Sequence, residues 1–159
     1  MIKLKDILKE VTIPNNMRIH MSKTPMTLQK KKYTQADGMK PNGFWYGFGK
    51  EWIDWTKTEM PEWVGKYIYE VKIPNNVLKI TSYKELLQFN ENFKTESNIG
   101  LSTINWKSVA SKYNGIEIVP YQQKARMSMN MNLLWYYGWD IASGCIWNLG
   151  NTSLNLISK

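Results

Sequence analysis

The sequence predicts an α+β domain with a mixed, mainly antiparallel β-sheet core and short flanking helices. Short segments in which apolar and polar residues alternate recur along the chain, and the few segments with helical spacing fall between them in no regular strand-helix-strand order. No glycine-rich loop follows a strand, so a doubly wound nucleotide fold is not expected. With 159 residues, the chain is predicted to form a single domain, residues 1–159.

The first half of the chain contains two predicted helices and four predicted strands. Apolar residues at spacings of three and four predict helices over residues 3–11 and 50–59, and Pro61 ends the second. The lysine-rich segment 22–38 is predicted to be a helix fragment followed by a mobile loop. Alternation predicts strands at 17–22, 44–48, 66–73 and 77–80.

The second half begins with the best-marked helix of the chain. Ser82 and Glu85 have the spacing of a capping box, which predicts a helix from residue 82 to about residue 93. A short helix is predicted over 105–113, and a strand over 116–119 that Pro120 ends. The remaining residues are neutral and aromatic, and they predict two or three closing strands within 133–138, 139–147 and 153–157.

Composition limits the chemistry that this chain can perform. Cys145 and His20 are the only cysteine and the only histidine, which excludes an internal disulfide, a zinc cluster and most histidine-based metal sites. No metal is therefore expected. The first residues alternate charge with apolar side chains, so neither a signal peptide nor a membrane span is expected, and the predicted location is the cytoplasm of the producing or a host cell. The net charge of +8 favours polyanionic partners.

Two of the candidate residues lie on predicted strands of the first half. The period of two places His20 on one strand face with Arg18 and Ser22. It also places Tyr46 on the face opposite Trp45. By themselves these patterns equally fit a hydrogen-bonded structural histidine and ordinary aromatic core packing.

Glu117 is the most informative carboxylate of the second half. Between Ser97 and Lys159 the only acidic residues are Glu117 and Asp140, and Glu117 stands between two isoleucines, where an unpaired charge is costly unless its strand face opens to a cleft or to solvent. Cys145 is expected to be a small buried hydrophobe. The sequence has no Gly-x-Ser-x-Gly nucleophile elbow, no Walker loop, no His-Glu-x-x-His helix and no Cys-x-x-Cys pair. Any catalysis by this chain is therefore expected to depend on substrate positioning and electrostatics.

These segments together resemble the ADP-ribosyltransferase superfamily, in particular its histidine-tyrosine-glutamate branch, which includes diphtheria-toxin-like and poly-ADP-ribose-polymerase-like enzymes. The matching segments are 18–22 around His20, 43–46 ending at Tyr46, and 115–118 around Glu117. The resemblance implies an ADP-ribosyltransferase-like split sheet and NAD as a substrate. Gly115 replaces the extra acidic residue of arginine-modifying members, and their Ser-Thr-Ser strand is absent, so modification of arginine is less expected.

The resemblance also implies a role for each matching residue. His20 would hold the adenosine-side ribose and keep NAD bent, Tyr46 would stack on the nicotinamide ring, and Glu117 would bind the 2′-hydroxyl of the nicotinamide ribose as the catalytic residue. Three further side chains from the same strands would complete the NAD-binding set: Arg18, Ser22 and Trp45. Of these, Arg18 would bind the pyrophosphate.

The acceptor is expected to be a macromolecule, with nucleic acid slightly favoured over protein. The basic run of Lys30, Lys31 and Lys32, together with Asn114 before the glutamate strand, forms the expected substrate-binding set. Such an enzyme could be a toxin or phage effector, with an antitoxin or host protein as a partner. Two other interpretations stay open: a non-enzymatic, basic, aromatic-rich module that binds nucleic acid, and a purely structural role for the aromatic residues and the charge.

Overall fold

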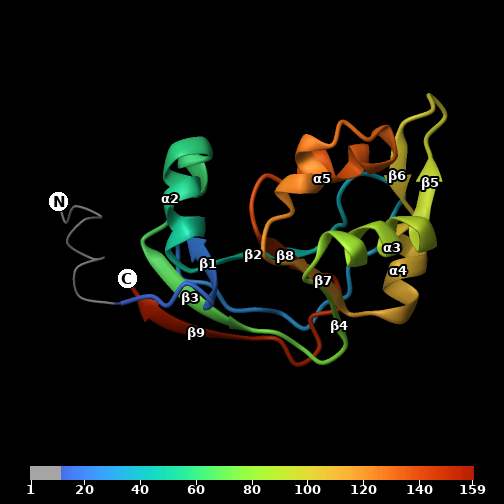
Figure 1. The fold of residues 1–159 in the computed structure, drawn as a ribbon. Coiled ribbons are helices and arrows are strands. Elements are labelled where there is room, and N and C mark those ends of the chain that lie inside the picture. The colour runs from blue at the N-terminus through green and yellow to red at the C-terminus, as the bar shows by residue number, and fades with distance from the viewer. Residues whose placement is uncertain (1–11) are drawn as a thin grey trace.

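The computed structural model describes residues 12–159, and the helix predicted over 3–11 lies outside them. A seven-stranded sheet in the order β4-β7-β8-β2-β1-β3-β9 forms the centre of the fold (Figure 1). β4 and β7 are parallel, and every other neighbouring pair is antiparallel. The α+β class and the mainly antiparallel sheet are therefore confirmed. The strands of this sheet are β1 (Arg18–Ser22), β2 (Phe44–Phe48), β3 (Tyr67–Lys72), β4 (Val77–Ile80), β7 (Gly115–Ile118), β8 (Ser143–Ile146) and β9 (Ser153–Ser158).

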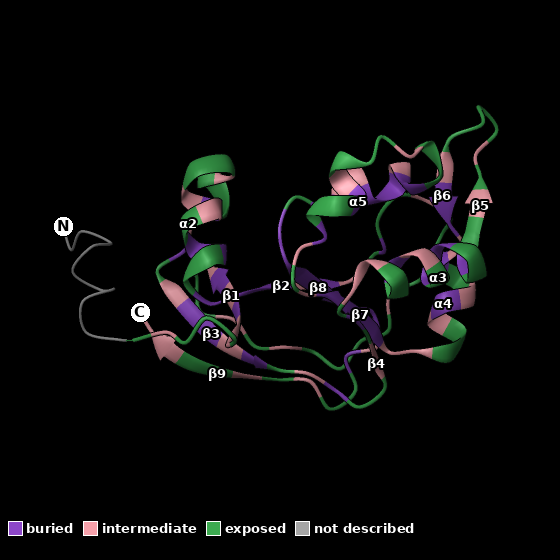
Figure 2. Ribbon diagram, in the orientation of Figure 1, coloured by how far each residue is buried: buried purple, intermediate pink, exposed green. Residues whose placement is uncertain are grey.

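The helices cover the two ends of the sheet separately. Helix α2 (Gly49–Glu59) lies over β1 and β3, while the other helices gather over β7 and β4 (Figure 1). These are α3 (Tyr83–Phe93), α4 (Trp106–Lys112), α5 (Gln123–Met127) and the 3-10 helix η2 (Met131–Gly138), and a second 3-10 helix, η1 (Pro61–Trp63), follows α2. Each group encloses a core of its own, and β7 and β8 between them are buried along their whole length (Figure 2).

Strands β1 and β2 diverge soon after they meet. Their ladder has two registered pairs, Arg18 with Phe48 and Ile19 with Gly47, whereas β1 stays paired with β3 as far as Ser22. Helix α2 packs closely on β2 at this point, since a β-carbon on Gly47 would lie 1.9 Å from a ring atom of Trp52. The sheet therefore opens between the first two strands of the chain, next to the predicted site residues.

The capping box predicted for α3 is present in a shifted form. Ser82 Oγ accepts a 3.2 Å hydrogen bond from the backbone N–H of Glu85. The Glu85 carboxylate accepts from both the backbone N–H and the hydroxyl of Thr81, at 2.6 and 2.9 Å, one residue earlier than the usual partner. These bonds satisfy donors at the helix start and lower the pKa of Glu85 below its usual value.

The chain after α4 differs most from the prediction. Residues 133–138 form part of η2 instead of a strand, and within 139–147 only Ser143–Ile146 is extended. In η2, the Trp135 indole donates to Asn90 of α3, and the Tyr136 hydroxyl accepts from the backbone N–H of Gln122, so tertiary packing decides the conformation of this aromatic run. Helix α5 and the hairpin of β5 (Lys94–Glu96) and β6 (Ser102–Ile104) carry no clear periodicity and were not predicted.

Candidate functional site

A buried ion pair with a tyrosine joins three strands of the sheet. Arg18 of β1 donates through Nε and Nη2 to the two carboxylate oxygens of Glu117 on β7, both at 2.8 Å. The Tyr46 hydroxyl of β2 donates to Oε2 of the same carboxylate at 2.7 Å. Glu117 is 2% exposed and Tyr46 is fully buried, so the carboxylate is surrounded by protein groups.

The hydrogen bonds decide the charge states of this cluster. Burial alone would raise the pKa of Glu117, but the bonds from Arg18 and Tyr46 outweigh it and the pKa lies below its usual value. The same bond to Glu117 raises the pKa of Arg18, and burial together with the carboxylate raises the pKa of Tyr46 far above its usual range. The folded protein thus holds an ionised pair whose carboxylate also accepts a hydrogen bond from a neutral phenol.

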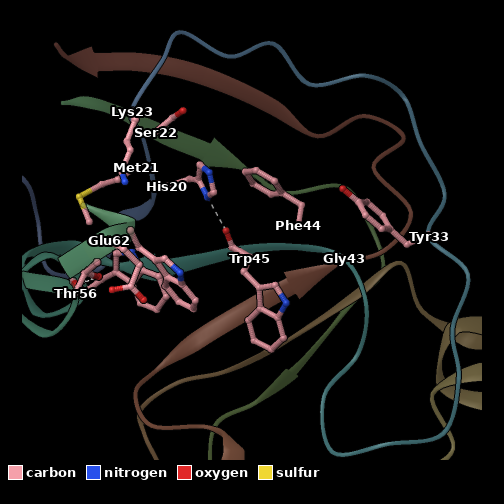
Figure 3. Close-up of a pocket in the computed structure, with 12 residues that line it drawn as sticks. His20, Met21, Ser22, Lys23, Tyr33, Gly43, Phe44, Trp45, Thr56 and Glu62 are labelled. Atoms are coloured by element: carbon pink, nitrogen blue, oxygen red, sulfur yellow. Dashed lines mark hydrogen bonds between the residues drawn. The ribbon is translucent and has the colours of Figure 1, made fainter. Parts of the chain in front are cut away.

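A cavity of about 510 Å³ opens where β1 leaves β2, and Figure 3 shows the residues that line it. Its walls are largely aromatic, and its polar lining comes from β1, α2 and η1. This volume lies within the range of small-molecule sites in proteins. The aromatic residues are Tyr33, Phe44, Trp45, Trp52 and Trp63, and the main polar ones are His20, Ser22, Lys23, Thr56 and Glu62.

His20 spans the gap between the two diverging strands. Its Nδ1 lies 2.8 Å from the backbone carbonyl oxygen of Trp45, and its ring is 4.4 Å from the Phe44 ring, centroid to centroid. Because a carbonyl only accepts, Nδ1 carries the proton and Nε2 of the neutral ring is an acceptor. Burial lowers the pKa of His20 although the Trp45 carbonyl opposes this, so the neutral form dominates at neutral pH.

The structure divides the predicted site residues into two groups. His20, Ser22 and Trp45 line the cavity, whereas Arg18, Tyr46 and Glu117 form the buried cluster and do not line it. Tyr46 has no exposed ring face, so it cannot stack on a ligand in this structure. Glu117 is 2% exposed and does not line the cavity, so the role expected for it at a ribose hydroxyl requires the surrounding side chains to move.

The residues predicted to bind the macromolecular substrate also lie in different places. Lys31 and Lys32 line a second hollow of about 520 Å³, which shares Tyr33, Gly43 and Trp45 with the His20 cavity, while Lys30 does not line it. Lys31 Nζ lies 4.4 Å from the centre of the Tyr33 ring.

Asn114 is occupied elsewhere. Its amide donates to the Asn75 carbonyl and accepts from Asn148, and its backbone carbonyl accepts from two further amides. This position therefore joins three loops, and both the nitrogen and the oxygen of its side-chain amide take part in those contacts.

Several lining residues were not among those predicted. Trp52 and Thr56 come from α2, whose apolar side was assigned to the core, and Glu62 and Trp63 come from η1, where only the proline was interpreted as a signal. The Pro-Glu-Trp string places a carboxylate beside a large ring directly after a helix end. That local pattern, joined to the observation that α2 follows the Trp45 strand without a loop, could have drawn attention to η1.

Two expected absences concern only the part of the chain that the structure describes. Residues 12–159 contain no group of three or more histidine, cysteine or acidic side chains placed to hold a metal ion. Within the same range, no helix has the length and apolar character needed to cross a membrane.

Cys145 is fully buried, and burial raises the pKa of its thiol well above the usual value.

No protein-family model matches the chain, and comparison with curated proteins and with solved structures found no match to it. The fold and the geometry of the site are therefore the basis on which a function is argued.

Proposed function

We propose that this domain is an NAD-dependent ADP-ribosyltransferase and that the His20 cavity binds NAD. The observation that carries the proposal is the neutral His20, held by the Trp45 carbonyl so that its Nε2 is an acceptor at an aromatic-walled cavity of about 510 Å³. An acceptor of this kind suits a ribose hydroxyl, which donates. The resemblance of segments 18–22 and 43–46 to the histidine-tyrosine-glutamate enzymes likewise implies that His20 binds a ribose of NAD.

The walls of the cavity suit the two flat rings of NAD. Phe44 and Trp45 flank the strand gap (Figure 3). Trp52 and Trp63 line the cavity from α2 and η1. Rings of this kind stack on nicotinamide and adenine and keep water from them. Lys23 is the basic side chain on the lining and would meet the pyrophosphate, because Arg18 already uses two of its donor groups on Glu117.

The reaction would need little chemistry from the protein itself. The bond between ribose C1′ and the nicotinamide nitrogen breaks, its electron pair neutralises the pyridinium, and positive charge develops on the ribose. Fixed negative charge and exclusion of water lower that barrier. The arrangement of residues around the bound ribose then decides the acceptor.

We favour an unpaired nucleic-acid acceptor over a protein. The hollow that contains Lys31 and Lys32 shares Tyr33 and Trp45 with the His20 cavity, so basic and aromatic side chains would lie near a ribose bound there. Phosphate contacts combined with ring stacking are the usual means of binding single strands. The same hollow favours a second candidate function, a nucleic-acid-binding module without enzymatic activity.

One pair of measurements tests the proposal. NAD at a hundred times its dissociation constant should raise the stability of the folded protein by about 2.7 kcal/mol, which is visible as a thermal shift. Incubation with NAD labelled in the adenosine half and a cell extract should then label a macromolecule, and nuclease or protease treatment identifies its class. A protein that binds single-stranded nucleic acid, shows no shift with NAD and transfers no label would be the non-enzymatic module.

A further inference from the structure

The His20 cavity contains a carboxylate other than the one that the sequence suggested. Among residues 12–159, the only acidic side chain that lines this cavity is Glu62 of η1. We infer that Glu62, and not Glu117, is the catalytic carboxylate that faces the ribose of bound NAD. This inference rests on the proposed function and identifies the carboxylate that would stabilise the positive charge on the ribose.

Glu117 is poorly placed for that task. It is 2% exposed and does not line the cavity, and its two oxygens accept three hydrogen bonds from Arg18 and Tyr46 at 2.7 to 2.8 Å. Releasing it would leave the Arg18 guanidinium without its partner in a half-buried position, which is costly. Because these groups enclose Glu117, a substrate hydroxyl could reach it only if they moved.

The backbone that carries Glu62 is held in position by η1. Pro61 fixes the first position of η1, and the N–H groups of Trp63 and Val64 donate to the carbonyls of Met60 and Pro61 at 2.9 and 3.2 Å. The Trp63 ring packs on Trp55 of α2, with 6.3 Å between centroids. Figure 3 shows Glu62 on the same side of the cavity as Thr56, away from Phe44 and Tyr33.

The charge of Glu62 is not used by a neighbour. Within residues 12–159, no lysine, arginine or histidine forms an ion pair with it, although the protein has a net charge of +8. The carboxylate is exposed at the cavity mouth and is free to accept from a ligand hydroxyl. A ribose between His20 and Glu62 would thus meet one neutral acceptor and one negative acceptor on opposite sides.

The proposed step balances in atoms and charge. The bond between C1′ and the nicotinamide nitrogen breaks, and its electrons leave with neutral nicotinamide. The Glu62 carboxylate stabilises the positive charge that develops on the ribose ring, as a carboxylate does in glycosyl transfer. The acceptor nucleophile then forms a bond to C1′ and loses a proton, which passes to Glu62 or to solvent.

The test uses the full chain with Glu62→Gln, Glu117→Gln and Glu59→Gln. Glu59 lies at the end of α2, is exposed, and does not line the cavity, so its variant is the matched control. Release of nicotinamide from NAD is measured below the melting temperature of each variant, and the dissociation constant for NAD is measured by calorimetry. We expect Glu62→Gln to lower the release rate on the order of 100-fold, with a change in the dissociation constant below about threefold.

Two results would overturn the inference in distinguishable ways. If wild-type protein releases nicotinamide and Glu62→Gln does so at the same rate, while folded Glu117→Gln does not, then the catalytic carboxylate is Glu117 and the proposed function stands. If wild-type protein neither binds NAD nor releases nicotinamide, the proposed function itself fails and the inference fails with it. Equal activity of Glu59→Gln and wild type is required for the expected result.

Discussion

The hydroxyl of Tyr46 donates a 2.7 Å hydrogen bond to Glu117, a residue 71 positions later in the chain. With Arg18 bound to the same carboxylate, this contact joins β1, β2 and β7, although β8 separates β7 from β2 in the sheet. The cluster lies beside the point where β1 leaves β2. It therefore fixes the geometry of the strand gap in which His20 and the cavity lie, without itself facing the cavity.

The buried pair should be strongly coupled in stability. Arg18→Met alone leaves a buried carboxylate and should cost about 3 to 5 kcal/mol. Glu117→Leu alone leaves a guanidinium whose side chain is 27% exposed, so it should cost less. The double variant removes both charges and should cost less than the sum of the single variants by more than 1 kcal/mol. Urea denaturation measures all three free energies of unfolding. Additive losses would show that the pair does not act as a unit.

The contact between Tyr46 and Glu117 also depends on a glycine on the intervening strand. A β-carbon on Gly144 would lie 2.3 Å from Cζ and 2.4 Å from the hydroxyl oxygen of Tyr46. Gly144→Ala should therefore displace the ring and destabilise the protein by about 1 to 3 kcal/mol, the usual cost of overpacking. Gly38→Ala is the control, because a β-carbon there meets its nearest atom at 3.9 Å. Equal melting temperatures for the two variants would contradict this account of the strand.

Local patterns in the sequence were sufficient to predict most strands of the sheet, but not to predict which residues line the cavity. Alternation identified β1 and β2 and placed Tyr46 opposite Trp45, and the structure confirms that the two residues pack into different cores. Alternation does not reveal which face of a strand borders a cavity. Here both faces of β2 border the cavity, Trp45 on one and Phe44 on the other, so the position of Tyr46 inside the buried cluster could not be read from the period of two.

The errors in the second half have a related cause. The run from Leu133 to Gly138 is apolar and aromatic with no clear period, so strand and 3-10 helix fit it equally well, and its contacts with Asn90 and Gln122 decide between them. The prediction of Glu117 as a site residue rested on a charge inside an apolar strand. That reasoning expected the strand face of Glu117 to open to a cleft or to solvent, whereas Arg18 and Tyr46 enclose the carboxylate.

His20 should make both stability and NAD binding dependent on pH. Its pKa in the folded protein lies below the ordinary value of about 6.5, because burial disfavours the charged ring. Below about pH 6.5, His20 binds a proton in the unfolded chain but stays neutral in the folded protein. The free energy of unfolding therefore falls as the pH falls from about 6.5 toward the pKa of the folded protein. Above about pH 6.5, the stabilisation from neutral His20 is fully present.

The variant His20→Asn isolates this effect. An asparagine amide can keep the bond to the Trp45 carbonyl but has no acceptor in the place of Nε2 and does not titrate. Unfolding measured in urea at pH 7.5 and 5.5 should show a smaller difference for the variant than for the wild type. Affinity for NAD should fall about tenfold at pH 7.5, the equivalent of about 1.4 kcal/mol. Unchanged affinity would remove His20 from the proposed NAD site.

The basic run from Lys30 to Lys32 should contribute to nucleic-acid binding through phosphate contacts. Two of these lysines line the hollow beside the NAD cavity, so replacing all three by glutamine should weaken binding of a single-stranded oligonucleotide and reduce its salt dependence. The slope of log K against log salt should fall in magnitude by about 2, roughly one unit for each lost contact. The control exchanges three exposed lysines that line neither this hollow nor the His20 cavity, Lys84, Lys94 and Lys107, and removes the same charge. If the two triple variants reduce the slope equally, the binding follows net charge alone and the hollow beside Tyr33 is not where the acceptor lies.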